Sequence, residues 1–197
     1  MCGITAAWSL DGGRVEASEF DVFVDALAHR GPDGRGTASL LDGRLWLGHR
    51  RLAIQDPTEA GAQPMWDATG RFAIVFNGEI YNFPELRQEL RALGHRFRTG
   101  TDTEVVLEAF ARWGPACQTR FNGMWALAIW DDRERRLFCS RDRFGVKPLL
   151  YHHAPGRFFA LASELKAFAA LPVVPLEIDR EVLLAPKSAR FEGTDRA

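Results

Sequence analysis

The sequence predicts an α+β protein in which antiparallel sheets are covered by helices. Its apolar extended segments occur in pairs joined by turn residues, as in hairpins, and amphipathic helical patterns separate these groups of strands. With 197 residues, of which 46% are hydrophobic, the chain is long enough to bury a substantial core as one domain.

The first part of the chain predicts strands on both sides of one helix. Residues 4–10 mix small and apolar side chains ahead of an Asp-Gly-Gly turn, which is typical of a strand. Ser18 is the expected N-cap of an amphipathic helix over residues 19–29. Residues 38–41 and 44–48 are separated by Asp-Gly, so we expect a hairpin there.

A further strand is predicted over residues 71–76, and Asn77-Gly78 follows it directly. Asn-Gly between apolar segments is the strongest short hairpin signal, so we expect a turn at this dipeptide. The remaining strands are expected as two hairpins, one over residues 124–130 and 136–140, the other over 149–152 and 157–162.

Two short amphipathic helices are expected between these hairpins. Asn82 with Glu85 and Thr101 with Glu104 have the spacing of capping boxes, in which a side-chain oxygen and a carboxylate satisfy the first backbone N–H groups. Gly94 is the expected end of the first of these helices. Each has one apolar face, so both are expected to lie on a sheet.

Charge and hydropathy exclude several classes of protein. The 25 basic and 26 acidic side chains give a net charge of -1, which argues against a nucleic-acid or membrane-surface binder. No apolar stretch approaches the roughly 18–20 residues of a membrane-spanning helix, and no secretory leader is recognisable. The expected location is the cytoplasm.

The cysteines predict neither a disulfide framework nor a metal site. Cys2, Cys117 and Cys139 are an odd number without Cys-x-x-Cys spacing, and the five histidines are scattered. Cys2 differs from the others because it directly follows Met1. Removal of Met1 would leave a thiol nucleophile and an α-amino base on one residue, which is suited to acyl transfer. The alternative is a small residue at a frayed chain end.

Other polar residues have both a structural and a functional interpretation. Asn77-Gly78 is either a plain turn or an oxyanion hole made of an amide and a backbone N–H. Asp102 either complements a helix dipole or pairs with a substrate ammonium. Arg51 is either a solvated charge or a clamp for a carboxylate.

Several motifs in order carry a resemblance to a known family. They lie at residues 2–4 (CGI), 29–34 (HRGPDG), 48–56 (GHRRLAIQD), 63–65 (QPM), 76–82 (FNGEIYN), 101–104 (TDTE) and 140–149 (SRDRFGVKPL). Together they resemble the glutaminase domain of glutamine-hydrolysing asparagine synthetases, within the class II glutamine amidotransferases. The resemblance covers roughly residues 2–170.

The resemblance implies a fold and a reaction. The fold would be that of an N-terminal-nucleophile hydrolase, a four-layer αββα sandwich of two mainly antiparallel sheets between helical layers. Cys2 would attack the side-chain amide of L-glutamine after removal of Met1, with its own α-amino group as base, and the thioester would be hydrolysed to glutamate. Asn77 and the N–H of Gly78 would hold the oxyanion.

The resemblance also implies how glutamine is held. Arg51 would bind the α-carboxylate, Glu79 and Asp102 would hold the α-ammonium, and main-chain groups near Leu52 and Ile54 would complete the pocket. The loop at Gly31-Pro32 would close over the substrate. Residues Arg141, Asp142, Arg143 and Lys147 are expected to form a buried or interface ion network without a catalytic step.

The predicted domain organisation is a glutaminase domain over residues 1–170 and a truncated inter-domain segment or loose tail over 171–197. A short helical pattern covers residues 179–184. The resemblance implies a second, synthetase domain with a Ser-Gly-Gly phosphate loop, to which ATP and Mg would bind. Neither that loop nor a Walker-type loop occurs in this sequence, so no cofactor is expected here, and ATP and Mg are expected only for the absent synthetase domain. That domain, or a separate subunit, would be the ammonia acceptor. A gene fragment, a free-standing subunit and a disrupted synthetase all remain open.

Two other functions remain as alternatives. One is an N-terminal-nucleophile amidase that acts on a different γ-amide or on a peptide. The other is a non-catalytic module that senses glutamine or binds a partner. The paired charges of Arg51 and Asp102 favour a free amino acid over the amidase substrates, and retained Met1 would indicate the non-catalytic module.

Overall fold

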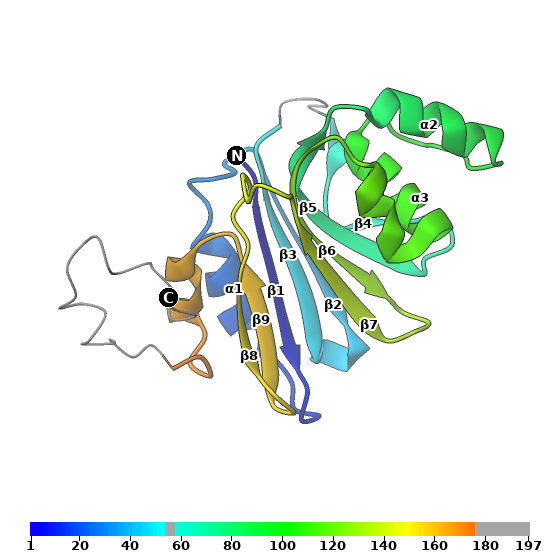
Figure 1. Cartoon of the computed structure of the whole chain (residues 1–197). Helices are drawn as coiled ribbons and strands as arrows, with labels where there is room; N and C mark the ends of the chain where they lie inside the picture. Colours follow the sequence, from blue (N-terminus) through cyan, green and yellow to red (C-terminus); the bar gives the residue numbers. More distant parts are fainter. Residues whose placement is uncertain (54–57, 176–197) are drawn as a thin grey trace.

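The fold consists of two antiparallel sheets packed face to face between helical layers (Figure 1). The computed structural model describes residues 1–53 and 58–175, and the helical pattern expected at 179–184 lies outside these ranges. The predicted αββα order of layers is confirmed.

The five-stranded sheet places the start of the chain in its centre. Gly3 at the start of β1 pairs with Arg50 near the end of β3. Cys2 therefore lies beside the last residue of β3, Arg51. The strand order is β2 (Gly34–Leu40), β3 (Leu45–Arg51), β1 (Gly3–Ser9), β9 (Phe158–Ala162) and β8 (Leu150–Ala154).

The four-stranded sheet corrects one prediction. Its order is β4 (Met65–Trp66), β5 (Phe72–Ile80), β6 (Gly123–Asp131) and β7 (Arg136–Arg141). The hairpin turn expected at Asn77-Gly78 is wrong, because β5 continues through both residues and pairs them with Ala126 and Trp125 of β6. The Asn-Gly signal is local, whereas the partner strand from a distant part of the chain keeps the backbone extended.

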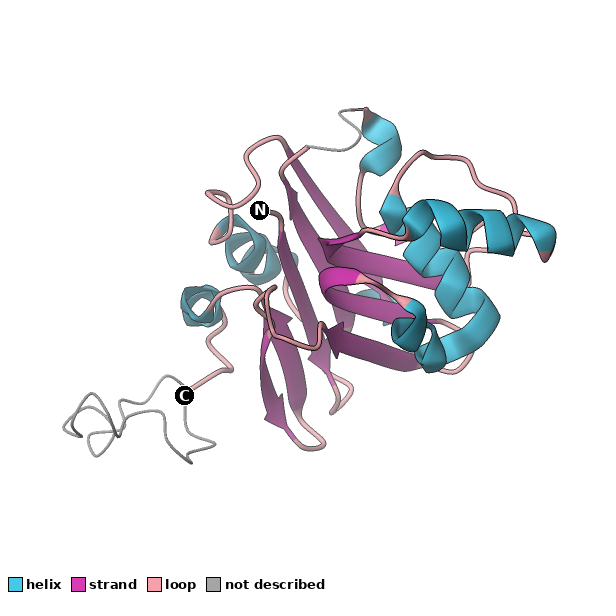
Figure 2. Cartoon of the chain, turned by 45° about the horizontal axis from the view of Figure 1, so that its top comes forward, coloured by secondary structure: helices cyan, strands magenta, loops and turns pink. Residues whose placement is uncertain are grey.

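Helices cover the outer face of each sheet (Figure 2). Against the five-stranded sheet lie α1 (Ala17–Asp25) and the 3-10 helix η4 (Leu165–Ala170). Against the four-stranded sheet lie α2 (Phe83–Ala92), α3 (Asp102–Trp113) and the 3-10 helix η3 (Gly114–Arg120). Shorter 3-10 turns occur at Leu41–Gly43 and Glu59–Gly61. None of the described helices is long and apolar enough to cross a membrane.

The observed helix ends agree only in part with those predicted from the sequence. The Thr101 hydroxyl caps α3 by accepting a hydrogen bond from the N–H of Glu104, as predicted. Asn82 precedes α2, but its side chain bonds the backbone of Arg120 and Asn122 instead of capping the helix. The expected helix over 19–29 is shorter, since Glu16 rather than Ser18 is the N-cap and tight turns follow its last residue, Asp25.

Three apolar clusters correspond to the three interfaces between the four layers. The outer two lie under α2 and α3 and under α1 and η4. The central cluster joins the two sheets and contains many small residues, including Ala6, Ala73, Ala126 and Ala128. Small side chains at facing positions let the sheets approach closely, so residues of both sheets can meet in one site at the end of the sandwich.

Candidate active site

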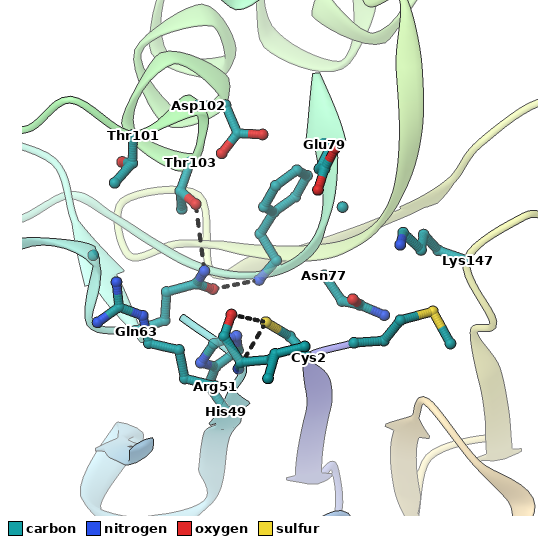
Figure 3. Close-up of a pocket in the computed structure, with 15 residues that line it drawn as sticks. Cys2, His49, Arg51, Gln63, Asn77, Glu79, Thr101, Asp102, Thr103 and Lys147 are labelled. Atoms are coloured by element: carbon teal, nitrogen blue, oxygen red, sulfur yellow. Dashed lines mark hydrogen bonds between the residues drawn. The ribbon is translucent and has the colours of Figure 1, made fainter. Parts of the chain in front are cut away.

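A pocket of about 100 Å³ lies at the end of the sandwich where β1 begins and β3 ends (Figure 3). It brings together most of the residues that the sequence predicted for one site: Cys2, Arg51, Leu52, Asn77, Gly78, Glu79 and Asp102. Ile54, the remaining predicted residue, lies outside the described residues. The two sheets and α3 all contribute to the walls of this pocket.

Cys2 lies directly before β1 with its thiol in the pocket. The backbone N–H of Leu52 lies 3.4 Å from Cys2 Sγ and donates to it, and the Leu52 carbonyl oxygen lies 3.7 Å from the same sulfur. The carbonyl of Cys2 accepts a hydrogen bond of 3.0 Å from Arg30 Nε. Both the main chain and the side chain of Cys2 are therefore held in place, while Met1 also lines the pocket.

Asn77 presents an unused donor. Its side chain is buried, and its Nδ2 has no hydrogen-bond partner among the described residues. A buried N–H without an acceptor costs free energy, which a ligand with an oxygen at that position would recover. Gly78 follows it in β5, where an added Cβ would lie 2.5 Å from the Met124 carbonyl oxygen, so a glycine is needed for this close backbone approach.

Two carboxylates form the acidic wall of the pocket. Asp102 is the first residue of α3, and its Oδ2 accepts a hydrogen bond of 3.0 Å from the N–H of Ile80. Burial raises the pKa of Asp102 to about 6, and the charge of Glu79 acts in the same direction. A cationic group that entered the pocket would favour the ionised form of Asp102.

Arg51 supplies the opposite charge from the end of β3. Its Nη1 donates a hydrogen bond of 2.7 Å to the carbonyl of Thr58. Gly61 leaves room for the guanidinium, because a Cβ at that position would lie 2.1 Å from Arg51 Nη2. The pocket therefore has a cation on the five-stranded sheet and carboxylates on β5 and α3 (Figure 3).

Several residues that the sequence did not predict for this site also line the pocket: His49, Gln63, Thr101, Thr103 and Lys147. Gln63 accepts a hydrogen bond of 2.6 Å from the N–H of Phe76, and its Nε2 donates to Thr103 Oγ1 at 3.3 Å. Burial lowers the pKa of His49 to about 3, so its imidazole is neutral. All five residues lie within the motifs that carry the resemblance, so these motifs could have identified them as pocket residues.

The loop that carries Lys147 also corrects a prediction. Asp142 accepts hydrogen bonds from backbone N–H groups, among them those of Val146 and Lys147, and these keep its pKa low although burial opposes this. Arg141 and Arg143 donate to backbone carbonyls. No ion pair joins these residues in the described part of the chain, so the expected buried ion network is wrong, while a network at an interface stays a prediction. Asp142 and Arg141 bond the backbone of the loop, whereas Arg143 donates to the carbonyl of Phe121.

Solved structures identify the fold class. Residues covering 86% of this chain match 43% of the glutamine phosphoribosylpyrophosphate amidotransferase from Bacillus subtilis complexed with ADP and GMP, with a TM-score of 0.72 and 23% identity. The structure of the allosteric regulatory enzyme of purine biosynthesis matches with a TM-score of 0.68, 21% identity and the same coverage. The chain therefore shares the fold of these two enzymes, an αββα sandwich of two antiparallel sheets.

The chain belongs to the glutamine amidotransferase domain family, whose model matches residues 1–196. It is 39% identical over 189 residues to glutamine-hydrolyzing asparagine synthetase 3 of Bacillus subtilis, and the matched segment covers 91% of this chain and 29% of that protein. It is 36% identical over 170 residues to glutamine-hydrolyzing asparagine synthetase 3 of Arabidopsis thaliana, and the matched segment covers 86% of this chain and 28% of that protein. The chain thus spans less than a third of the length of these relatives.

Proposed function

We propose that this domain hydrolyses L-glutamine to L-glutamate and ammonia through a thioester on Cys2, and supplies the ammonia for asparagine synthesis. The observation that carries the proposal is the pocket itself: a thiol lies beside a buried amide with an unused N–H, between a guanidinium and two carboxylates. That set fits a free amino acid with a side-chain amide.

The chemistry begins with removal of Met1, which frees the α-amino group of Cys2. This amine takes the proton of the thiol, and the sulfur attacks the side-chain carbonyl of glutamine. Asn77 Nδ2 and the N–H of Gly78 stabilise the oxygen as it becomes negative, which is the largest contribution expected in acyl transfer. The intermediate expels ammonia with a proton from the same amine, and water then hydrolyses the thioester.

Opposite charges hold the amino-acid end of the substrate. Arg51 binds the α-carboxylate, and Glu79 and Asp102 bind the α-ammonium. Main-chain groups of Leu52 and Ile54 complete the contacts, and the loop at Gly31-Pro32 closes over bound glutamine. Because these charges are fixed on different walls, the pocket selects a zwitterion over an amide that lacks either charge.

The ammonia acceptor is a synthetase domain, on the same polypeptide or on a separate subunit. The relatives are asparagine synthetases more than three times as long as the matched segment. ATP and Mg would bind there, and the glutaminase chemistry needs no cofactor. A cytoplasmic location and a domain boundary near residue 170 remain predictions.

The test is glutamate release from L-glutamine by the purified chain, together with its intact mass. Active protein is expected to lack Met1, and Cys2→Ala is expected to release no glutamate. Cys2→Ser, which keeps a hydroxyl nucleophile and the free amine, serves as the matched control for folding. Undiminished turnover by Cys2→Ala would overturn the mechanism.

The same assay separates the two alternatives. Hydrolysis of N-acylated glutamine as fast as of glutamine would favour an amidase for other substrates, since the acyl group removes the charge that Asp102 and Glu79 would bind. Glutamine binding without turnover, with Met1 retained in the intact mass, would favour a sensing module.

A further inference from the structure

We propose that Glu164 is a positioning residue that fixes Cys2 in the pocket through the guanidinium of Arg30. The kinetic consequence rests on the proposed glutamine hydrolysis, but the placement of Cys2 can be tested without it. Glu164 itself does not line the pocket; it acts from the segment directly after β9, at the other end of the domain sequence.

Arg30 connects the two residues. Its Nε donates to the carbonyl oxygen of Cys2 at 3.0 Å, and its Nη1 donates to Glu164 Oε1 at 2.8 Å. The side chain of Arg30 is only 8% exposed. A buried guanidinium needs a carboxylate partner, since an unpaired charge in such a place is strongly unfavourable. Glu164 thus determines where the guanidinium lies, and the guanidinium determines where the Cys2 carbonyl lies.

The carboxylate of Glu164 is held in its charged form by several donors. Burial opposes ionisation, but hydrogen bonds from Arg30, His29 and Lys166 outweigh it and lower the pKa of Glu164 to about 2. His29 Nε2 lies 3.0 Å from Oε1, and Lys166 Nζ lies 3.4 Å from Oε2. The ion pair between Glu164 and Arg30, here called the clamp, is therefore charged at every pH at which the domain would work.

A neighbouring residue supports the same interpretation. Ser163 Oγ accepts a hydrogen bond of 3.0 Å from the N–H of Ile4, and the Ser163 N–H donates to the Ile4 carbonyl at 3.0 Å. Ser163 thus fixes the backbone of Ile4, and Glu164 fixes the backbone of Cys2 through Arg30. Such anchoring is needed because a residue at the very end of a chain is otherwise free to fray.

The experiment compares Glu164→Ala and Glu164→Gln with a control, Glu89→Ala. Glu89 also pairs with an arginine, since its Oε1 lies 2.8 Å from Arg120 Nη2, but neither residue lines the pocket or contacts Arg30 or Cys2 in the described residues. Hydrogen exchange of the peptide 2–8 measures order at Cys2, and steady-state kinetics with glutamine separate kcat from KM. All variants are compared well below their thermal transitions.

We expect faster exchange in residues 2–8 of Glu164→Ala and a fall in kcat of about 10- to 100-fold, the cost of a misplaced reacting group. KM should change by no more than about twofold, because Arg51 and Asp102 are untouched. Glu164→Gln should be intermediate and Glu89→Ala unchanged. Exchange in Glu164→Ala equal to that in Glu89→Ala would overturn the positioning role of Glu164. Faster exchange in Glu164→Ala, without any glutaminase activity in the wild type, would support the positioning role and reject the proposed function.

Discussion

Asn77 holds a side-chain N–H inside the pocket without an acceptor among the described residues, and this lowers the stability of the protein when no ligand is bound. We expect Asn77→Ala to lower kcat for glutamine hydrolysis by about 10²–10³-fold. The same substitution should leave the free energy of unfolding equal to or above that of the wild type, since it removes an unsatisfied donor. Kinetics and urea unfolding of one variant check both statements; a loss of stability with normal kcat would contradict the oxyanion role.

We expect Asp102 to make glutamine binding depend on pH. Its pKa in the folded protein is about 6, above the ordinary value of 3.8 for an aspartate, mainly because of burial. Below pH 6 the protonated side chain cannot pair with the α-ammonium, so the Kd for glutamine should rise about fivefold between pH 6 and pH 5, as the ionised fraction of Asp102 falls. Calorimetry with the Cys2→Ala variant measures binding without turnover. Asp102→Asn should bind weakly at both pH values, and a steep pH dependence in that variant would assign the titration to another group.

The stability effect of Asp102 has the opposite sign to that of a salt-bridged carboxylate. Between pH 3.8 and 6 the folded state keeps a proton that the unfolded state releases, so this group lowers stability as the pH rises through that interval. Above pH 6 the cost is constant. Asp102→Asn should therefore be at least as stable as the wild type at pH 7 in denaturant titrations, provided that the amide oxygen keeps the bond to Ile80 N–H. Lower stability of the variant would show that the carboxylate is structural.

At the scale of single elements, β5 combines regular strand pairing with the two residues of the proposed oxyanion hole, Asn77 and Gly78. Gly78 meets the Met124 carbonyl and the Phe76 ring where a Cβ would lie at 2.5 and 2.7 Å, so Gly78→Ala should cost about 1–3 kcal/mol. Gly100→Ala is the matched control, because nothing lies within 4 Å of its Cβ position. Urea midpoints of the two variants give the comparison, and equal midpoints would refute the close approach.

Elements were predictable where local signals and tertiary pairing agree. Thr101 caps α3, and the paired strands β6 with β7 and β8 with β9 follow the expected turns. The prediction failed at Asn77-Gly78, where the ladder with β6 overrides a turn signal. It also failed at residues 141–147, where Arg141 and Asp142 bond backbone groups of the same loop instead of other charged side chains. The first failure concerns a partner strand that is distant in sequence, and the second concerns local backbone groups that compete for the charged side chains.

At the scale of the whole molecule, the spacing between the two sheets determines whether the pocket is assembled. Cys2 belongs to one sheet and Asn77 to the other, and Ala126, which pairs with Asn77, lies in the core between them. Ala126→Leu should therefore cost about 1–3 kcal/mol and also lower kcat, because it separates the sheets. Ala92→Leu is the control, since Ala92 is exposed at the end of α2. Unchanged activity in Ala126→Leu, despite lost stability, would show that the pocket tolerates a change in spacing.

The sequence by itself determined the fold class, because capping pairs, hairpin turns and apolar periodicity are local. It also determined most of the predicted pocket, because the motifs that carry the resemblance contain the pocket residues. Only the tertiary structure decided that β5 runs straight through Asn77-Gly78, that Gln63, His49 and Lys147 join the pocket, and that Glu164 reaches Cys2 through Arg30. The physical reason is distance along the chain: such contacts arise when the two sheets pack, and burial then sets the charge of Asp102 and His49.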